Sequence, residues 1–158
     1  NIVYEDAAID QAVEGVVNGI FFNQGHVCCA GSRLLLQESI HDEFVAKLEK
    51  RMQTLRVGNP LDKNTDIGAI NSKEQLNKIE GLVNEGVSDG GKIFQTECEL
   101  PGNGFWFKPT LFTDVQPSYS IAREEIFGPV LTTLTFRTPQ EAVEIANNTE
   151  YGLSLIHI

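Results

Sequence analysis

Residues 33–52, with the sequence RLLLQESIHDEFVAKLEKRM, contain an apolar run that leads directly into an amphipathic segment. The run at residues 33–37 has the length and composition of a short buried strand. In the following segment, acidic residues come early and basic residues late, as the helix dipole prefers. Its apolar residues recur at helical spacing, namely Ile40, Phe44, Val45, Leu48, Met52 and Leu55. We therefore expect a strand and then a helix, capped by Ser39 and ended by Gly58 and Pro60.

Helical patterns recur on both sides of this unit. Asp6 is placed to cap a helix whose apolar residues run from Ile9 to Ile20, with an end expected at residues 23–25. Ser72 opens the sequence SKEQ, a capping box in which the Ser hydroxyl and the Gln75 side chain satisfy free helical amides. Thr138, Pro139 and Glu141 start a further helix with a second capping box.

Strand-like runs separate these helices. They lie at residues 1–3, 92–95 and 128–136, and residues 106–112 are extended but broken by Pro109. Strands that alternate with helices of ten or more residues indicate an α/β fold with a largely parallel sheet flanked by helices. At 158 residues, with 41% hydrophobic and 22% charged residues, the chain fits one globular domain.

Charge and cysteine usage limit the function. The net charge of -10 repels phosphodiester backbones, so we expect no nucleic-acid partner. No run of about eighteen apolar residues and no signal-peptide pattern occurs, so we expect no membrane association. Three cysteines, two of them adjacent, suit free thiols in a reducing compartment. We expect a soluble intracellular protein, in the cytoplasm or in an organellar matrix.

Two adjacent thiols lie in the segment FFNQGHVCCAGSR, residues 21–33, between a predicted helix and a predicted strand. Glycines bracket the turn, and such turns hold catalytic groups on a rigid scaffold. A thiolate held where backbone amides converge can attack a carbonyl while the amides stabilise the oxyanion. The residues alone leave a second interpretation open, in which Cys28 and Cys29 only fill the core.

This segment resembles the active-site signature of the aldehyde dehydrogenases, in which an aromatic residue, a glycine and usually a glutamine precede the reactive cysteine. The resemblance implies that Cys28 is the nucleophile and Cys29 its neighbour. His26 stands where the family usually has glutamine or glutamate.

REEIFGPV, residues 123–130, resembles the second signature of that family, and it begins about ninety-five residues after the cysteine, as in the family. The resemblance implies that NAD or NADP is the cofactor, that Glu125 binds the hydroxyls of the nicotinamide-side ribose, and that Phe127 packs beside the nicotinamide. Gln75 and Lys78 match family positions that contact ribose, although a capping residue and a solvated lysine explain them equally well. No His, Cys and Asp cluster has metal-ligand spacing.

The implied activity is oxidation of a small-molecule aldehyde to a carboxylic acid through a thiohemiacetal and a thioester on Cys28. In the family a glutamate activates the hydrolytic water, and it lies upstream of the segment matching Asn1, as does the nucleotide-binding domain. Residues 1–153 thus resemble a catalytic domain truncated at both ends, about a third of a full-length enzyme, and we expect the chain alone to be inactive. Residues 154–158 are interpreted as a foreign tail.

Three alternatives remain open. A CoA-acylating semialdehyde dehydrogenase would pass the acyl group to a thiol instead of water. A non-catalytic member of the family could serve as a structural or scaffolding protein. An unrelated α/β binding module would require both motifs to be coincidental. For the full-length enzyme the family implies a homodimer or homotetramer.

Overall fold

The computed structural model describes residues 1–152, so the predicted tail at residues 154–158 lies outside the described part. Five strands form one sheet in the order β1-β2-β5-β4-β3. Their bounds are Ile2–Val3 for β1, Arg33–Gln37 for β2, Lys92–Gln95 for β3, Thr110–Thr113 for β4 and Val130–Phe136 for β5. The pairs β1 with β2, β2 with β5 and β4 with β5 are parallel, and β3 pairs antiparallel with β4. The prediction of a largely parallel sheet is confirmed.

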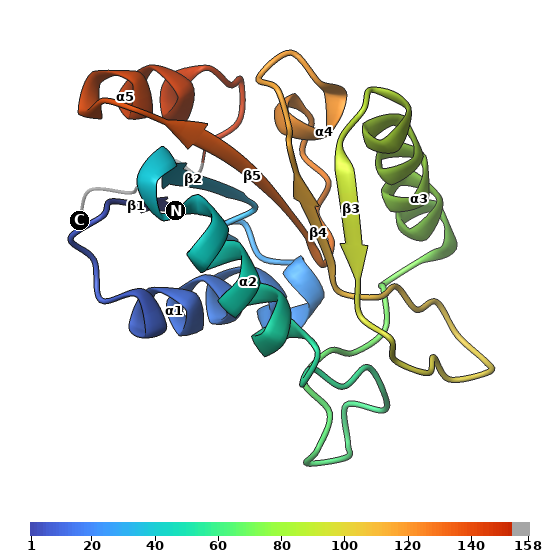
Figure 1. The fold of residues 1–158 in the computed structure, drawn as a ribbon. Coiled ribbons are helices and arrows are strands. Elements are labelled where there is room, and N and C mark those ends of the chain that lie inside the picture. Colours follow the sequence, from blue (N-terminus) through green and yellow to red (C-terminus); the bar gives the residue numbers. More distant parts are fainter. Residues whose placement is uncertain (153–158) are drawn as a thin grey trace, which may run out of the picture.

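Helices cover both faces of this sheet (Figure 1). The long helices are α1 (Ile9–Phe21), α2 (His41–Met52), α3 (Lys73–Ser88) and α5 (Pro139–Asn147), and α4 (Ser120–Arg123) is a single turn. Neighbouring residues of β4 point to opposite faces: Leu111 packs into the core under α1 and α2, and Phe112 into the core under α3 and α4. A third cluster under α5 contains Leu35, Phe136 and Ala142.

Two of the predicted helix caps are wrong. The helix expected at Asp6 begins two residues later, with Ala8 at the N-cap and no side-chain cap. Ser39 lies in a short 3-10 turn, η2 (Glu38–Ile40), and α2 follows from His41. The Ser39 hydroxyl donates instead to the Glu5 carboxylate at 2.8 Å. The sequence pattern cannot show this competing partner, because Glu5 is distant in the chain.

Each predicted capping box forms only one of its two hydrogen bonds. Ser72 accepts a hydrogen bond from the Gln75 amide at 3.1 Å, and Thr138 accepts one from the Glu141 amide at 3.2 Å. The reciprocal bonds of a capping box do not form. The Glu141 carboxylate accepts from the Arg137 amide at 2.8 Å, one residue before the N-cap. The Gln75 side chain reaches another segment, described below.

The central strand differs from its predicted pattern. An alternating strand would bury one face, but six of the seven residues of β5 are buried. This burial follows from the position of β5 between β2 and β4 with helices on both sides. Pro109 immediately precedes β4, in agreement with the expected break in residues 106–112. The single turn α4 and the 3-10 turn η1 (Phe22–Gly25) were not predicted.

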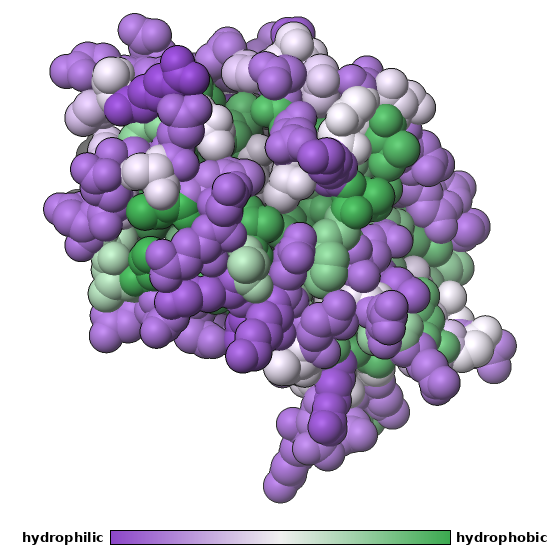
Figure 2. Space-filling view, in the orientation of Figure 1, coloured by the Kyte–Doolittle hydropathy of each residue, from purple (hydrophilic) through white to green (hydrophobic). Residues whose placement is uncertain are grey.

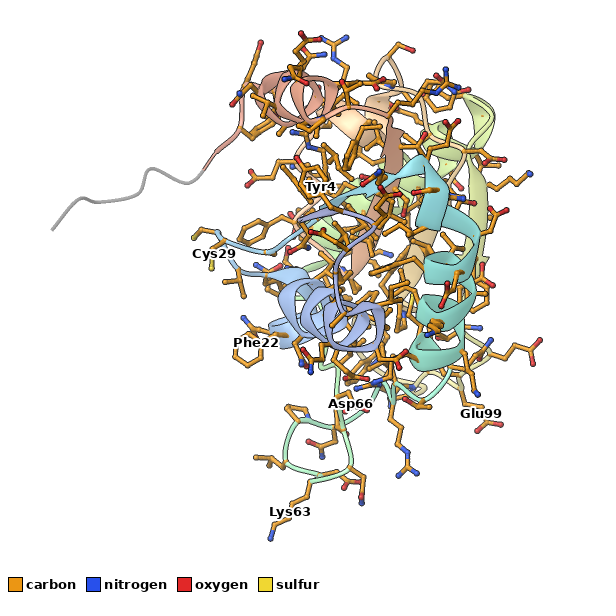
Figure 3. All side chains as sticks on the ribbon, turned by 60° about the vertical axis from the view of Figure 1, so that its left-hand side comes forward. Tyr4, Phe22, Cys29, Lys63, Asp66 and Glu99 are labelled. Carbon is orange, nitrogen blue, oxygen red and sulfur yellow. The ribbon has the colours of Figure 1, made fainter. Side chains whose placement is uncertain are left out.

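The face of the molecule in Figure 2 is largely hydrophilic, and the projecting loop that contains Lys63 and Asp66 belongs to that polar surface (Figures 2 and 3). Among residues 1–152, no helix has the length and apolar character needed to cross a bilayer.

Candidate active site

The segment that joins α1 to β2 carries Cys28 and Cys29 and is called the cysteine loop below. It begins with an abrupt change of backbone conformation at the end of α1. Asn23, Gln24 and Gly25 have φ angles of 49°, 48° and 75°, all in the left-handed region. Left-handed residues cannot continue a right-handed helix, so the chain turns away from the α1 axis. The His26 amide donates to the Asn23 carbonyl at 2.9 Å, and the Asn23 side chain donates to the His26 carbonyl at 3.1 Å.

The two thiols lie at the corner of the next turn. The Ala30 amide donates to the Val27 carbonyl at 2.9 Å, which places Cys28 and Cys29 at the middle of a tight turn. Both cysteines are exposed. In Figure 3, Cys29 projects from the outer edge of the molecule, on the same side as Phe22. The interpretation of the pair as core filler is therefore wrong.

A cavity of about 670 Å³ opens beside this turn. It is lined by the residues from Cys28 to Arg33, by Ala122 to Ile126, and by residues near the end of α5. Cys28 and Glu125 thus share one cavity, although they come from segments far apart in the sequence. The exposed Glu125 side chain leaves a carboxylate accessible to a ligand.

The cavity wall carries charged and polar groups besides Glu125. Arg33 donates from its guanidinium to the Ile145 carbonyl at 3.2 Å and the Ala146 carbonyl at 2.8 Å, where α5 ends. Burial lowers the pKa of Arg33. The Tyr151 hydroxyl donates to the Glu124 carboxylate at 3.1 Å, and this hydrogen bond raises the pKa of Tyr151.

The turn at residues 125–129 packs directly against the cysteine loop. Phe127 has a φ of 54°, a left-handed conformation that is unfavourable for a bulky aromatic residue. A β-carbon on Gly25 would lie 2.1 Å from the carbonyl oxygen of Gly128. Only glycine at residue 25 allows this approach, and its positive φ points to the same requirement.

Three segments meet at the backbone of this turn. The Phe127 carbonyl lies 2.7 Å from His26 Nδ1 and 3.0 Å from Gln75 Nε2. Gln75 Nε2 also donates to the Ile126 carbonyl at 2.9 Å. The His26 and Phe127 rings stack, with centroids 5.6 Å apart and an interplanar angle of 16°. The Asn71 amide donates to His26 Nε2 at 3.3 Å.

The predicted site residues therefore fall into two groups. Cys28 and Glu125 line the cavity, and Phe127 and Gln75 meet at the turn that follows Glu125. Lys78 lies one turn further along α3, exposed and in no ion pair with any of residues 1–152. The roles of these five residues stay predictions.

Sequence reasoning missed the contacts of His26 and Arg33. The partners of His26 lie 45 and 101 residues away, and those of Arg33 lie 112 and 113 residues away. No local pattern could have revealed them. No group of three or more His, Cys, Asp or Glu side chains within residues 1–152 could hold a metal ion.

The fold and the site together define an α/β protein with a mostly parallel sheet, whose cavity holds an exposed thiol and a carboxylate from two distant loops. Residues 1–156 match the model of the aldehyde dehydrogenase family. The chain belongs to that family, as its two sequence motifs indicated.

Relatives from different kingdoms agree with this assignment. The chain is 46% identical over 155 residues to an aldehyde dehydrogenase of Emericella nidulans, covering 98% of this chain and 31% of the relative. It is 46% identical over 156 residues to retinal dehydrogenase 2 of Taeniopygia guttata, covering 97% of this chain and 30% of the relative. The chain thus spans about a third of the length of the relatives it matches.

Solved structures share the fold. The NAD-dependent aldehyde dehydrogenase of Sinorhizobium meliloti superimposes with a TM-score of 0.92 at 43% identity, covering 96% of this chain and 30% of that structure. A point mutant of betaine aldehyde dehydrogenase of Staphylococcus aureus has a TM-score of 0.92 at 39% identity, covering 97% of this chain and 32% of that structure. The latter holds NAD+ and a BME-modified cysteine.

Proposed function

We propose that the full-length protein containing this chain oxidises a small-molecule aldehyde to a carboxylic acid with NAD+ or NADP+, using Cys28 as the nucleophile. The observation that supports this most directly is that the exposed Cys28 thiol and the exposed Glu125 carboxylate line the same cavity. If the thiol were buried, or the carboxylate lay on another face, residues of the two motifs could not contact ligands bound in one cavity.

Cys28 begins the reaction. Its thiolate attacks the aldehyde carbon, a carbon–sulfur bond forms, and the carbonyl electron pair moves to oxygen. Within residues 1–152 the Cys28 amide donates to no protein acceptor, so this N–H is available to stabilise the oxyanion. Loss of hydride from the thiohemiacetal leaves a thioester on sulfur. Water then attacks the thioester carbon and releases the acid and the Cys28 thiolate, while a general base takes the proton of the water.

NAD+ or NADP+, when bound, accepts the hydride. The residues present fit such a group, because Glu125 can accept hydrogen bonds from two adjacent ribose hydroxyls. Phe127 would pack beside the nicotinamide. Lys78 would reach the ribose from α3, and Gln75 would do so only with its amide oxygen, because its nitrogen is held by the Ile126 and Phe127 carbonyls.

The relatives support the redox class, since several are named as NAD-dependent or were solved with NAD+. Their names cover retinal and betaine aldehyde, so they do not select one aldehyde for this protein. Exposed free thiols suit a reducing compartment, and we place the reaction in the cytoplasm or an organellar matrix. For the whole enzyme we propose a homodimer or homotetramer.

Substitution of Cys28 tests the mechanism in the full-length enzyme. We expect Cys28→Ala to lower aldehyde-dependent formation of NADH or NADPH by at least about 10³-fold, because deletion of a covalent nucleophile removes the main reaction path. The rate is followed by the absorbance of the reduced nicotinamide over a panel of short aliphatic and aromatic aldehydes. Cys29→Ala and Cys98→Ala are the matched controls and should retain activity.

The same assay separates the alternatives. Oxidation that requires added coenzyme A and yields an acyl thioester would assign the acylating class. A wild-type protein that oxidises no aldehyde, and whose Cys28 reacts with iodoacetamide no faster than Cys98, would overturn the proposal in favour of a scaffold. A fast-reacting Cys28 that aldehyde protects supports the proposal.

A further inference from the structure

His26 connects three segments that are distant in the sequence. Its backbone belongs to the cysteine loop, two residues before Cys28. Its ring contacts the Asn71 amide, just before the N-cap of α3, and the carbonyl of Phe127. The ring also stacks on the Phe127 side chain. Neither sequence motif assigns this side chain a role.

The two backbone partners determine which ring nitrogen carries the proton. A backbone amide can only donate, so His26 Nε2 must offer Asn71 a lone pair. A backbone carbonyl can only accept, so Nδ1 must carry the hydrogen that faces Phe127. The surroundings therefore fit the Nδ1–H tautomer of the neutral ring. The other tautomer would place hydrogen against hydrogen at Asn71 and a lone pair against oxygen at Phe127.

We propose that His26, as its Nδ1–H tautomer, is a positioning residue. It holds Phe127 in its left-handed conformation and ties the turn at residues 125–129, the cofactor-side turn, to the cysteine loop. Phe127 has a φ of 54°, which an aromatic residue keeps only when its surroundings enforce it. His26 contributes a 2.7 Å hydrogen bond and a stacked ring to that enforcement. Gln75 adds the second donor to the same carbonyl.

The inference rests on the proposed function, because Phe127 matters for catalysis only if the nicotinamide packs beside it. The consequence is specific. A loss of the His26 contacts should misplace Phe127 and weaken cofactor binding, while the Cys28 thiol and the aldehyde it attacks are affected less. The role is therefore visible as a change in the KM for the cofactor rather than as a uniform loss of rate.

Four variants of the full-length enzyme separate the contacts. His26→Gln keeps one donor and one acceptor, His26→Phe keeps only the stacking, and His26→Ala keeps neither. His41→Gln is the matched control, because His41 lies on α2 and its ring contacts only Asp42 among its polar neighbours in residues 1–152. We measure kcat and KM for NAD+ at saturating aldehyde, and KM for the aldehyde at saturating NAD+.

We expect His26→Phe and His26→Ala to raise the KM for NAD+ by roughly tenfold, because the Asn71 amide loses its acceptor and the Phe127 carbonyl loses one of its two donors. His26→Gln should stay within about twofold of wild type, since its amide can serve both. A merely structural role predicts less active enzyme with an unchanged KM. An unchanged KM for NAD+ in His26→Ala, or failure of His26→Gln to restore it, would overturn the inference.

A second readout does not depend on turnover. Nitrogen NMR of histidine-labelled full-length protein reports which ring nitrogen is protonated, and His26→Gln identifies the resonance. We expect a protonated Nδ1 in the neutral ring, and a protonated Nε2 would contradict the proposal. If wild type oxidises no aldehyde, the proposed function fails, while the tautomer and the dissociation constant for NADH in His26→Ala still decide the role of His26.

Discussion

Four non-glycine residues of the described chain have left-handed backbone, and three of them surround the candidate site: Asn23, Gln24 and Phe127. Each such residue costs about 1–2 kcal/mol relative to right-handed backbone. Asn23 offsets part of this cost because its side chain donates a hydrogen bond to the His26 carbonyl. For Phe127, the carbonyl accepts hydrogen bonds from the His26 and Gln75 side chains. Strain of this kind persists where the surrounding contacts enforce it, and it gathers here at the proposed contact between nucleophile and cofactor.

At the residue scale, Gly25 is the most restrictive position of the loop. We expect Gly25→Ala to push the cysteine loop away from the Gly128 carbonyl, which lies 2.1 Å from the added methyl position. A displacement of about 1 Å in a catalytic group can lower kcat/KM by roughly 10²-fold. Steady-state kinetics of the full-length enzyme measure this loss.

Gly81→Ala is the matched control for that substitution. Gly81 lies inside α3, and an added methyl group there would meet nothing within 4 Å. It should keep full activity and raise stability by about 0.5–1 kcal/mol, because alanine loses less entropy in a helix. Equal activity of Gly25→Ala and wild type would show that the close approach to Gly128 is not required.

At the scale of elements, periodicity predicted the helices and strands well because burial repeats along each of them. It failed for helix caps, because a capping side chain can bind a partner that is distant in the sequence. The Ser39 hydroxyl, for example, donates to Glu5 instead of capping the helix. Periodicity also misjudged β5, since strand position in the sheet decides whether one face or both are buried. Spacing alone could not place Cys28 and Glu125 in one cavity, and only the family resemblance suggested that the two motifs cooperate.

One ion pair between elements should make stability depend on pH. The Glu38 carboxylate accepts from Arg137 Nε at 2.8 Å and Nη2 at 3.0 Å, which joins η2 to the segment after β5. These hydrogen bonds and the charge of Arg137 hold the pKa of Glu38 below its ordinary value of 4.5. The contribution is therefore fully present above the ordinary pKa and is lost as the pH falls through the lowered one.

We expect Glu38→Gln to lower the Tm slightly at neutral pH and to match wild type in acid, where the wild-type carboxyl is protonated. The effect is small because the pair is exposed to solvent. Glu144→Gln, on the exposed face of α5, serves as the control and should follow wild type at every pH. A difference between Glu38→Gln and wild type that persists unchanged in acid would exclude the ion pair as its cause.

At the scale of the whole molecule, β4 connects the two cores. Leu111 and Phe112 are both 0% exposed, yet Leu111 packs with α1 and α2 and Phe112 with α3 and α4. Because adjacent side chains of one strand face opposite sides, a loss of packing on either face is transmitted to the same backbone hydrogen bonds with β5. The site depends on both faces, since the cysteine loop follows α1 and the Glu125 turn contacts α3.

We therefore expect Leu111→Ala and Phe112→Ala to destabilise one cooperative unit, by about 2–5 and 3–5 kcal/mol respectively. Amide hydrogen exchange of the full-length protein, resolved by segment, measures this as faster exchange in β4, β5, α1 and α3 for both variants. Val143→Ala, on an exposed position of α5, should leave these segments unchanged. If Phe112→Ala accelerated exchange only in α3 and α4 and left α1 protected, the two faces would unfold separately. The cysteine loop could then keep its structure while the cofactor-side turn was lost, because the packing of α1 would no longer depend on that of α3.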